Sequence, residues 1–417
     1  MLSIDFIKQN KEKVKAAAKN KGYKIDLDKL LTIEENKRKK SQEIQKLRQE
    51  LNTLSKKGID ASTKKLNKQK RVLIQQEEEK LKEISDEFKT LQYEIPNLPL
   101  EDVHVGENET KNKVIKKSPN DPIKFDFKPK DHLELGELLD IIDVKTASKV
   151  SGSRFGYLKN EAVILEFALI QLALNVLSKE GFIPIIPPVL INKQITEELG
   201  YWHGGGNDDY YLVFEPLNKD SFFYLVGTAE HSLVPMHKEE VLNKKELPKR
   251  YVGFSTAFRR EAGSYGKDVK GIFRVHQFDK VEMVSFTIDE NDSKEHEYLL
   301  SLEEKLFQML EIPYQVIKMC TGDLGFPIAK KYDIEAWIPS QNKYREVTST
   351  STTTDFQARR LNIKYQDGPE KKFVHILNGT AFAIGRTLVA ILENNQQKDC
   401  SVKIPKVLQK YTGFKEI

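Results

Sequence analysis

The chain has 417 residues and a formal net charge of +5. A chain of this length predicts two or three domains rather than one core. Hydrophobic residues make up 39% of it and charged residues 31%, which is typical of a soluble globular protein on the charged side of the range. The small positive excess is compatible with a polyanionic partner but does not require one.

The two cysteines, Cys320 and Cys400, are far apart and form no CxxC motif. We therefore expect neither a disulfide framework nor a thiolate zinc site, and a reduced, cytoplasmic setting is favoured. The N-terminus MLSIDFIKQNKEK interrupts its apolar residues with charge, unlike a signal peptide. A membrane helix needs roughly 18 consecutive apolar residues, and we expect no apolar run of nearly that length. The best candidate, GFIPIIPPVLI, is broken by Pro184, Pro187 and Pro188. We therefore also expect no membrane partner.

Residues 27–93 are rich in Lys, Glu and Gln and contain no proline. Two series of positions step alternately by three and four residues, which is the seam of a heptad pattern with two lysines in it. The series are Leu30, Ile33, Lys37, Lys40, Ile44, Leu47, Leu51 and Leu54, then Ile74, Glu77, Leu81, Ile84, Phe88, Leu91 and Ile95. With the turn-like KKGIDAS between them, they predict an antiparallel two-helix hairpin.

The hairpin carries many lysines and arginines, and two interpretations remain open. It is either a solvated coiled coil whose charges keep it soluble, or a basic arm that binds nucleic acid phosphates. The following EIPNLPLEDVHVGENET contains the prolines and polar residues of a linker. We therefore expect an N-terminal domain over residues 1–100 and a second domain over residues 101–417.

In the second domain, short β-rich runs alternate with a few helices and lack a regular βαβ rhythm, which predicts an α+β fold. A helix is expected over residues 158–180, ending at Gly181. Its apolar face is formed by Leu165, Leu169, Leu172 and Val176. The prolines of GFIPIIPPVLI predict a strand at a sheet edge, which either covers a core or forms a subunit interface.

The segment FRREAGSYGKDVKGIFRVHQFDKVEM, from Phe258 to Met283, is predicted to form two strands around a loop. Because side chains alternate along a strand, Arg259 and Glu261 should share one face of the first strand. The polar face of the second strand would carry Arg274, His276, Phe278, Lys280 and Glu282, and the apolar face Phe273, Val275 and Val281. The loop glycines Gly263, Gly266 and Gly271 would let it close over a ligand.

This polar face fits a nucleotide. Arginine grips phosphate oxygens, Phe278 could stack on a base, Glu261 could accept from an exocyclic amine, and Glu282 could bind a polar or cationic group. The alternative is an exposed sheet face with cross-strand ion pairs. For His276 a structural role is expected.

The segment FVHILNGTAFAIGRTLVAILENN predicts a strand, a turn of small residues and an apolar helix from about Gly385. Arg386 falls in the first turn of this helix, where a cation opposes the helix dipole. The position makes sense if Arg386 and the helix N-terminus share an anionic ligand, and pairing with a local carboxylate is the alternative.

Together these segments resemble the class II aminoacyl-tRNA synthetases, and specifically the bacterial type of the seryl-tRNA synthetase family. Residues 160–188 are similar to motif 1, the Arg-x-Glu hairpin to motif 2, and AIGRTLVAILEN to motif 3. The stretches TASKVSGSRFGYLKNEAV, GTAEHSL, CTGDLGFPIAKKYDIEAWIP and DFQARR are similar to the serine enzymes in particular. The resemblance covers nearly the whole chain and implies an antiparallel catalytic sheet preceded by a coiled-coil arm.

The resemblance implies an ATP-dependent serine–tRNA ligase. It would activate L-serine with ATP and Mg²⁺ and load tRNA(Ser), with tRNA(Sec) as a further candidate acceptor. The implied partners are the tRNA, bound by the N-terminal arm, and a second copy of the chain in a homodimer.

The resemblance also implies roles for single residues. The catalytic arginines would be Arg259 on the α-phosphate and Arg274 and Arg386 on the distal phosphates. Glu261 would read adenine and Phe278 stack on it. The implied ATP site is Arg259, Arg260, Glu261, Phe278, Glu346, Val347, Thr348, Ser349 and Arg386, with Glu346 and Ser349 holding magnesium. The implied serine site is Thr228, Ala229, Glu230, Glu282 and Thr380.

The chain departs from the family in two places. The family commonly has SSCSN where this chain has Thr348 to Thr352, so Thr350 and Thr352 replace the usual Cys and Asn. The segment YWHGGGNDDYYLVF, residues 201–214, also differs and is either a mobile segment near the site or a surface turn.

The sequence disfavours three alternative functions. A ligase that loads a carrier protein would lack the arm that residues 27–93 predict. A catalytically silent binding paralogue is disfavoured by the intact motif arginines. A coiled-coil scaffold would have no use for the arginine-bearing hairpin.

Overall fold

The computed structural model describes residues 1–56, 61–201, 209–215, 218–261 and 270–417. It divides into two compact units, Met1–Pro96 and Asn97–Ile417. The turn expected within KKGIDAS, the glycines of residues 204–206, and Gly263 and Gly266 lie outside the described residues.

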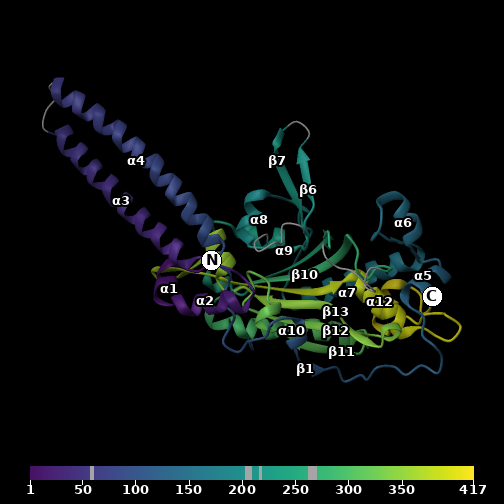
Figure 1. Cartoon of the computed structure of the whole chain (residues 1–417). Helices are drawn as coiled ribbons and strands as arrows, with labels where there is room; N and C mark the ends of the chain where they lie inside the picture. The colour runs from purple at the N-terminus through teal and green to yellow at the C-terminus, as the bar shows by residue number, and fades with distance from the viewer. Residues whose placement is uncertain (57–60, 202–208, 216–217, 262–269) are drawn as a thin grey trace. The chain divides into compact units, whose positions relative to one another are not determined.

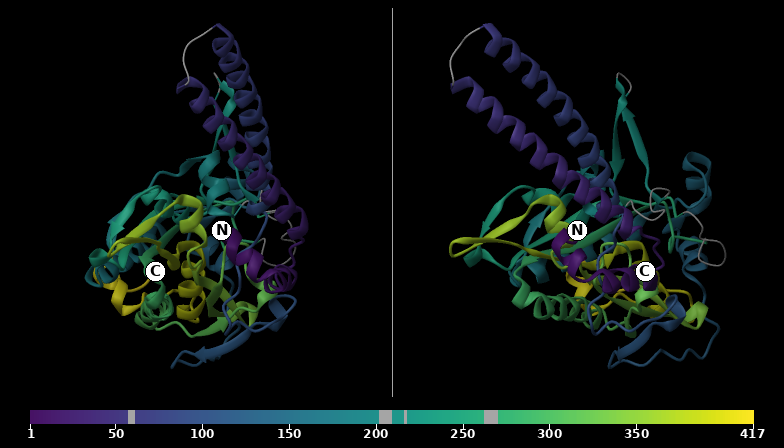
Figure 2. Two further views of the ribbon diagram at one scale, coloured as in Figure 1. Left: turned by 90° about the vertical axis from the view of Figure 1, so that its left-hand side faces the viewer. Right: turned by 60° about the vertical axis from the view of Figure 1, so that its left-hand side comes forward.

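The first unit is helical and contains the predicted hairpin. Its helices are α1 (Ile4–Gln9), α2 (Lys11–Asn20), α3 (Leu27–Lys56) and α4 (Ala61–Tyr93). The long helices α3 and α4 run side by side in both figures (Figures 1 and 2). Seam positions Leu30, Ile44 and Ile74 are buried, as the heptad pattern predicts.

The two seam lysines have specific partners on the other helix. Lys37 Nζ lies 4.7 Å from the centre of the Phe88 ring, and Lys40 Nζ lies 2.6 Å from a Glu77 carboxylate oxygen. Polar pairs of this kind fix the register of a coiled coil at some cost in stability. The lysines are therefore part of the seam rather than interruptions of it.

The second unit is built on a sheet with the strand order β1-β11-β12-β13-β16-β10-β9-β4. These strands are β1 (Lys113–Lys117), β4 (Ile183–Ile185), β9 (Lys249–Phe258), β10 (Gln277–Thr287), β11 (Tyr314–Lys318), β12 (Lys330–Ile338), β13 (Lys343–Thr352) and β16 (His375–Ala383). Neighbouring strands are antiparallel, except that β4 runs parallel to β9. The predicted α+β class is confirmed, and the proline-bearing strand β4 lies at the edge, as expected.

Three long helices, α7, α10 and α12, share the main apolar cluster with the sheet. On β10, Val281 and Met283 point into this cluster, whereas Phe278 and Lys280 line a cavity. Around the cavity the sheet therefore has one apolar face covered by helices and one polar face. Further along β10, Val284 and Phe286 belong to a second apolar cluster. The helices of this unit are α5 (His132–Leu138), α6 (Val144–Ser151), α7 (Asn160–Lys179), α8 (Lys193–Leu199), α9 (Glu230–Leu233), α10 (Asp292–Met309), α11 (Phe356–Leu361), α12 (Ile384–Asn395) and α13 (Lys406–Thr412).

Smaller sheets flank the main one. Strand β14 lies between β15 and β8, β2 pairs with β3, and β7 lies between β5 and β6. Their bounds are β2 (Ile142–Asp143), β3 (Tyr157–Leu158), β5 (Leu190–Asn192), β6 (Leu212–Glu215), β7 (Asn218–Leu225), β8 (Val241–Asn243), β14 (Lys364–Asp367) and β15 (Glu370–Phe373).

Helix α7 corrects one expectation from the sequence. Within the described residues it is long and apolar enough to cross a membrane by length and composition, so our statement about apolar runs was wrong. The reason is that a core helix of a large α+β domain has the same composition. Leu165, Leu169 and Leu172 are buried in the main cluster, while Ile164 and Phe167 on the same helix are 45% and 63% exposed.

Two further expectations were wrong in their local geometry. The small residues of NGTAFA form no turn, because β16 continues through them and α12 begins directly at Ile384. Strand β9 ends at Phe258 and strand β10 begins only at Gln277. Strand alternation therefore does not apply to the hairpin residues between them. Phe273 and Val275, which we expected on the apolar face, both line the cavity. Phe273 also packs in the main apolar cluster, as expected.

Candidate active site

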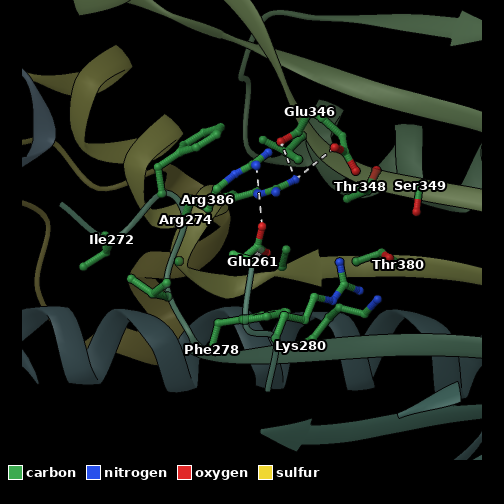
Figure 3. Close-up of a pocket in the computed structure, with 16 residues that line it drawn as sticks. Glu261, Ile272, Arg274, Phe278, Lys280, Glu346, Thr348, Ser349, Thr380 and Arg386 are labelled. Carbon is green, nitrogen blue, oxygen red and sulfur yellow. Dashed lines mark hydrogen bonds and ion pairs between the residues drawn. The ribbon is translucent and has the colours of Figure 1, made fainter. Parts of the chain in front are cut away.

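A cavity open to solvent lies on the polar face of the sheet. The space free of protein atoms is about 560 Å³, counting the solvent at its mouth. Strands β10, β13 and β16, the start of α12 and the hairpin arms supply its walls (Figure 3). The lining residues are Arg259, Glu261, Ile272, Phe273, Arg274, Val275, Phe278, Lys280, Glu346, Val347, Thr348, Ser349, Thr380, Ala383, Gly385 and Arg386.

Three arginines enter this cavity, each held by a contact to the protein. Arg259 Nε donates to the Gly227 carbonyl at 3.1 Å, and its guanidinium lies 5.5 Å from the centre of the Phe278 ring. Arg274 lies 3.5 Å from a Glu261 carboxylate oxygen. A guanidinium offers five N–H donors, so each arginine can bind an anion as well as its protein partner.

Arg386 lies in the first turn of α12, where a cation opposes the helix dipole. Its Nη1 contacts Glu346 twice, the carboxylate at 3.2 Å and the backbone carbonyl at 3.1 Å. The local carboxylate expected as the alternative partner of Arg386 is therefore present. It does not exclude an anionic ligand, because Arg386 and the backbone at Ala383 and Gly385 all line the cavity.

Burial would raise the pKa of Glu346, but Arg386, Lys331 and Arg259 together lower the pKa to about 2. Glu346 is thus ionised at neutral pH, and solvent, which reaches 42% of its side chain, favours the same form. Strand β13 pairs with β12, and the register of this pairing shifts at Val347. Glu346 pairs with Glu335 and Thr348 with the neighbouring Ile334, so Val347 is an extra residue in β13. This bulge brings Glu346 and Ser349 to the same face of the strand.

Glu346 and Ser349 are suitable oxygen donors for magnesium bound together with a nucleotide. Within the described ranges, no group of three or more His, Cys, Asp or Glu side chains could hold a metal ion on its own. Mg²⁺ typically keeps several waters and takes one or two carboxylates plus substrate phosphates. One ionised carboxylate and a hydroxyl on one strand face match that pattern.

A buried polar cluster lies next to the cavity and is connected to it through Thr380. Thr380 Oγ1 donates to Glu282 at 3.2 Å, and Lys280 Nζ lies 2.6 Å from the same carboxylate. Tyr201 donates to Glu230 at 2.7 Å, and Gln357 donates to Glu230 at 3.3 Å. The two buried carboxylates suit a small cationic ligand.

Desolvation dominates the electrostatics of this cluster. Burial, then repulsion from Glu282, raises the pKa of Glu230 to about 7, although Tyr201 and Gln357 oppose the shift. Burial lowers the pKa of Lys280, and Glu282 opposes that change. An ammonium ligand beside Glu230 would favour its ionised form.

The structure brings together most of the residues predicted from the sequence. Every predicted ATP-site residue lines the cavity except Arg260, which is exposed and donates its backbone N–H to the Asp209 carbonyl at 2.8 Å. Thr348 also turns its hydroxyl away, donating to the buried Glu303 on α10 at 2.9 Å. In the predicted serine site, Thr228, Ala229, Glu230 and Glu282 are buried beside the cavity rather than in its lining.

The threonines that depart from the family pattern are engaged within the fold. Thr350 Oγ1 donates to the Asn378 carbonyl at 2.8 Å, and Thr352 Oγ1 donates to Asp292 at 2.8 Å. Both follow the Glu346–Ser349 segment along β13, so their contacts fix the end of the strand that carries this wall.

Sequence reasoning assigned no role to several residues of the site. Lys280 was on the predicted polar face, and strand alternation was the signal that could have identified it. Gln357 lies in the DFQARR stretch that we noted for its resemblance, and Tyr201 begins the divergent segment. Glu303 gave no signal, because a glutamate in a long charged helix usually faces solvent.

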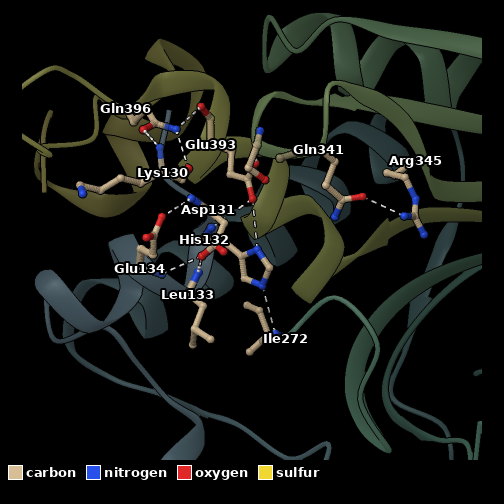
Figure 4. A network of polar contacts seen from close by, with 12 residues as sticks. Lys130, Asp131, His132, Leu133, Glu134, Ile272, Gln341, Arg345, Glu393 and Gln396 are labelled. Atoms are coloured by element: carbon tan, nitrogen blue, oxygen red, sulfur yellow. Dashed lines mark hydrogen bonds and ion pairs between the residues drawn. The ribbon is translucent and has the colours of Figure 1, made fainter. Parts of the chain in front are cut away.

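A second polar network holds the return arm of the hairpin from behind (Figure 4). Glu393 of α12 accepts from His132 Nδ1 at 3.1 Å, and His132 Nε2 accepts from the Ile272 backbone N–H at 3.4 Å. The adjacent Gly271 has φ +70°, and a Cβ there would lie 2.0 Å from His132 Nε2. Only glycine fits this position, so the arm is fixed where it enters the cavity wall.

Comparisons with known proteins identify the family. The seryl-tRNA synthetase N-terminal domain family matches residues 1–99, and the class II tRNA synthetase core domain family (G, H, P, S and T) matches residues 211–395. The serine–tRNA ligase of Thermodesulfovibrio yellowstonii is 43% identical over 99% of each chain. The chain belongs to the seryl-tRNA synthetase family.

Solved structures agree with this assignment. The seryl-tRNA synthetase of Pyrococcus horikoshii, complexed with ATP, has a TM-score of 0.90 and 41% identity, covering 100% of this chain and 99% of that one. The cytoplasmic serine–tRNA ligase of Naegleria fowleri, in complex with AMP, has a TM-score of 0.85 and 32% identity, covering 98% and 95%. The predicted family and the predicted architecture are both confirmed.

We predict that Gly379→Ala damages the site from within β16. A Cβ at Gly379 would lie 2.8 Å from Glu303 Oε1 and 3.2 Å from Thr350 Oγ1, and Glu303 is tied to Thr348. Overpacking of this kind costs about 1–3 kcal/mol, to be measured as a loss of unfolding free energy in denaturant. In the control Gly325→Ala, the Cβ would meet only Ile328 at 3.5 Å, so that variant should retain full stability. Equal stability of the two variants would contradict the prediction.

Proposed function

We propose that this chain is a serine–tRNA ligase. It joins L-serine to ATP to give seryl-adenylate and then transfers the seryl group to the 3′ end of tRNA(Ser). One observation carries the proposal: a cavity with three arginines and an ionised Glu346 is joined, through the Thr380–Glu282 hydrogen bond, to a buried polar cluster with two carboxylates. The names of the full-length relatives support the same activity.

In the first step, a serine carboxylate oxygen attacks the α-phosphorus of ATP, and pyrophosphate leaves with the electrons of the broken P–O bond. A carboxylate is already nucleophilic at neutral pH, so this step requires no protein base. Catalysis then depends on alignment and on neutralisation of growing phosphate charge. Arg259 would bind the α-phosphate, and Arg274 and Arg386 the β- and γ-phosphates.

The ATP would be oriented by its base and by its metal ion. Glu261 would accept a hydrogen bond from the adenine amine, and Phe278 would stack on the ring. Arg260, Val347 and Thr348 complete the proposed ATP site, Thr348 through its backbone because its hydroxyl is engaged by Glu303. Mg²⁺, which neutralises phosphate charge when bound, would be held by Glu346 and Ser349.

Serine would be bound by Thr228, Ala229, Glu230, Glu282 and Thr380. The buried carboxylates of Glu230 and Glu282 suit its ammonium group, and Thr380 with Glu282 suits its hydroxyl. A pocket built to bond a hydroxyl rejects alanine strongly, because the unmatched buried polar groups are costly. Threonine would be excluded by size.

The helical hairpin of α3 and α4 would bind the tRNA, and tRNA(Sec) is a second candidate acceptor. Basic residues along the hairpin suit phosphate contacts, and the match of residues 1–99 to the family's N-terminal domain supports this role. The same match disfavours a carrier protein as the acceptor. The proposed setting is the cytoplasm.

We also propose that the chain forms a homodimer through α7 and the edge strand β4. Exposed apolar side chains of this region are Ile164, Phe167, Ile183 and Ile186. Apolar surface of this kind, next to a sheet edge, is typical of a subunit interface.

Sedimentation velocity of the purified chain should give a dimer. A Phe167→Glu variant should shift the oligomeric state towards monomer.

The proposed activity is tested by ATP–pyrophosphate exchange with each of the twenty amino acids. Exchange should depend on serine, and exchange with another amino acid but not with serine would overturn the substrate assignment.

We predict that Arg259→Ala lowers the rate of serine-dependent exchange by at least ~100-fold, or about 2.7 kcal/mol of transition-state stabilisation. The guanidinium is lost where charge develops on the α-phosphate. Near-normal exchange in this variant would remove Arg259 from the mechanism.

We predict a pH dependence of serine binding. The pKa of Glu230 is raised to about 7, so below that pH the carboxyl must lose a proton before it can pair with the serine ammonium. The KM for serine should rise by up to about tenfold per pH unit as the pH falls below 7, whereas the KM for ATP should not follow it. Glu230→Gln should remove this dependence, and an unchanged pH profile in that variant would assign the effect to another group.

We predict that the outer part of the hairpin is required for charging but not for activation. Residues 45–73 can be replaced by a short glycine linker between Ile44 and Ile74, which are both buried on the seam. Exchange in this variant should stay within about twofold, since the cavity lies wholly in the second unit, while tRNA charging should fall by ~100-fold or more. Charging at the normal rate would show that the arm is not the tRNA-binding element.

A further inference from the structure

The loop between α6 and β3 contacts both arms of the 258–283 hairpin at once. Arg154 Nη1 donates to the Glu261 backbone carbonyl at 2.9 Å. The Arg154 backbone carbonyl accepts from the His276 N–H at 3.0 Å. One residue from outside the hairpin therefore holds its outgoing arm by a side chain and its returning arm by the backbone.

His276 continues this connection to Arg259. The His276 carbonyl accepts from the Arg259 N–H at 2.9 Å, and its ring Nδ1 lies 3.1 Å from the Arg259 carbonyl oxygen. Because a carbonyl oxygen can only accept, Nδ1 carries the proton. The ring also contacts Phe155 at 5.3 Å and Tyr211 at 6.1 Å between centres. The backbone of Arg259 is therefore fixed on both sides of the residue.

The backbone conformation indicates that these contacts determine the shape of the arm. Arg154 and Glu261 have φ of +62° and +51°, in the left-handed region that side-chain-bearing residues seldom adopt. Such conformations cost about 1–3 kcal/mol each and persist where surrounding contacts determine them. At Glu261 this conformation directs the carbonyl to Arg154 and the carboxylate into the cavity, 3.5 Å from Arg274.

We infer that Arg154 and His276 are positioning residues of the ATP site, which hold the backbones of Arg259 and Glu261 so that their side chains meet the α-phosphate and the adenine. Neither residue lines the cavity, so both act through the hairpin. The inference rests on the proposed function, in which Glu261 reads the adenine amine. It predicts that Arg154, from outside the cavity, helps to determine the preference for adenine.

The test measures serine-dependent pyrophosphate exchange with ATP and with inosine triphosphate, whose base has a carbonyl in place of the adenine amine. The variants are Arg154→Ala, Arg154→Lys, His276→Ala, His276→Asn and Glu261→Ala. The control is Lys149→Ala, which removes an exposed cation of α6 in the same segment. Thermal unfolding of each full-length variant is recorded alongside.

For Arg154→Ala we expect the KM for ATP to rise and the ATP-to-inosine-triphosphate ratio of kcat/KM to fall, each by roughly tenfold or more, as for loss of a charged hydrogen bond. The KM for serine should change by less than about twofold, since its pocket is separately held. Arg154→Lys, which keeps a charged donor, should recover part of the ratio. His276→Ala should mainly raise the KM for ATP, and His276→Asn, which keeps an N–H near Nδ1, should recover part of it.

The outcomes separate failure of this inference from failure of the proposed function. A chain without serine-dependent exchange would refute the proposed function. If exchange occurs and the ATP-to-inosine-triphosphate ratio of kcat/KM falls in Glu261→Ala but not in Arg154→Ala, only the positioning role is overturned. A ratio unchanged in Glu261→Ala would refute the adenine contact and the inference together. If the KM values for ATP and for serine rose equally in Arg154→Ala, with a lower unfolding temperature, Arg154 would be a general structural residue.

Discussion

The ion pair between Arg386 and Glu346 joins the start of α12 to β13, and the geometry of the cavity depends on it. A cation in the first turn of a helix is unfavourable by itself, and the ionised carboxylate 3.2 Å away offsets that effect. The bulge at Val347 is what turns Glu346 towards the helix and leaves Ser349 on the same face. With both charges retained in a partly desolvated space, the site has a fixed electrostatic pattern before any ligand binds.

The polar groups that support this site lie mostly behind it. His132 and Glu393 hold the return arm at Ile272, and Glu303 lies under β13 and β16, where Gly379 makes room for it. A buried polar group is costly unless it is bonded, so such groups tolerate few arrangements of their neighbours. On the other side, the Arg154 loop fixes the hairpin arms. The hairpin arms and strands that carry the ligand-facing arginines are thus held by contacts outside the cavity lining.

Local patterns predicted some of these features and missed others for definite reasons. Alternation along β10 correctly placed Phe278 and Lys280 on the polar face, because they lie inside a regular strand. The same argument failed for Val275, which precedes the strand and lines the cavity. It held only in part for Phe273, which packs in the main apolar cluster but also lines the cavity. The small residues of β16 resemble a turn in the sequence, but they are small because Glu303 and Met283 pack closely against Gly379. The apolar composition of α7 is shared by core helices and membrane helices, so composition could not separate the two.

The sequence by itself determined the α+β class, the helical hairpin with its seam, the edge position of β4 and the residues that carry the family motifs. These follow from periodicity, proline chemistry and short-range motifs, all of which are local along the chain. Only the tertiary structure decided that Glu346 faces Arg386, that Thr348 turns to Glu303, and that Arg154 connects Glu261 with His276. Each of these contacts joins residues 40 or more positions apart. The first depends on the bulge at Val347, the second on a helix packed beneath the sheet, and the third on left-handed backbone at Arg154 and Glu261. Distances of that kind depend on how the sheet and helices pack, and no local pattern encodes them.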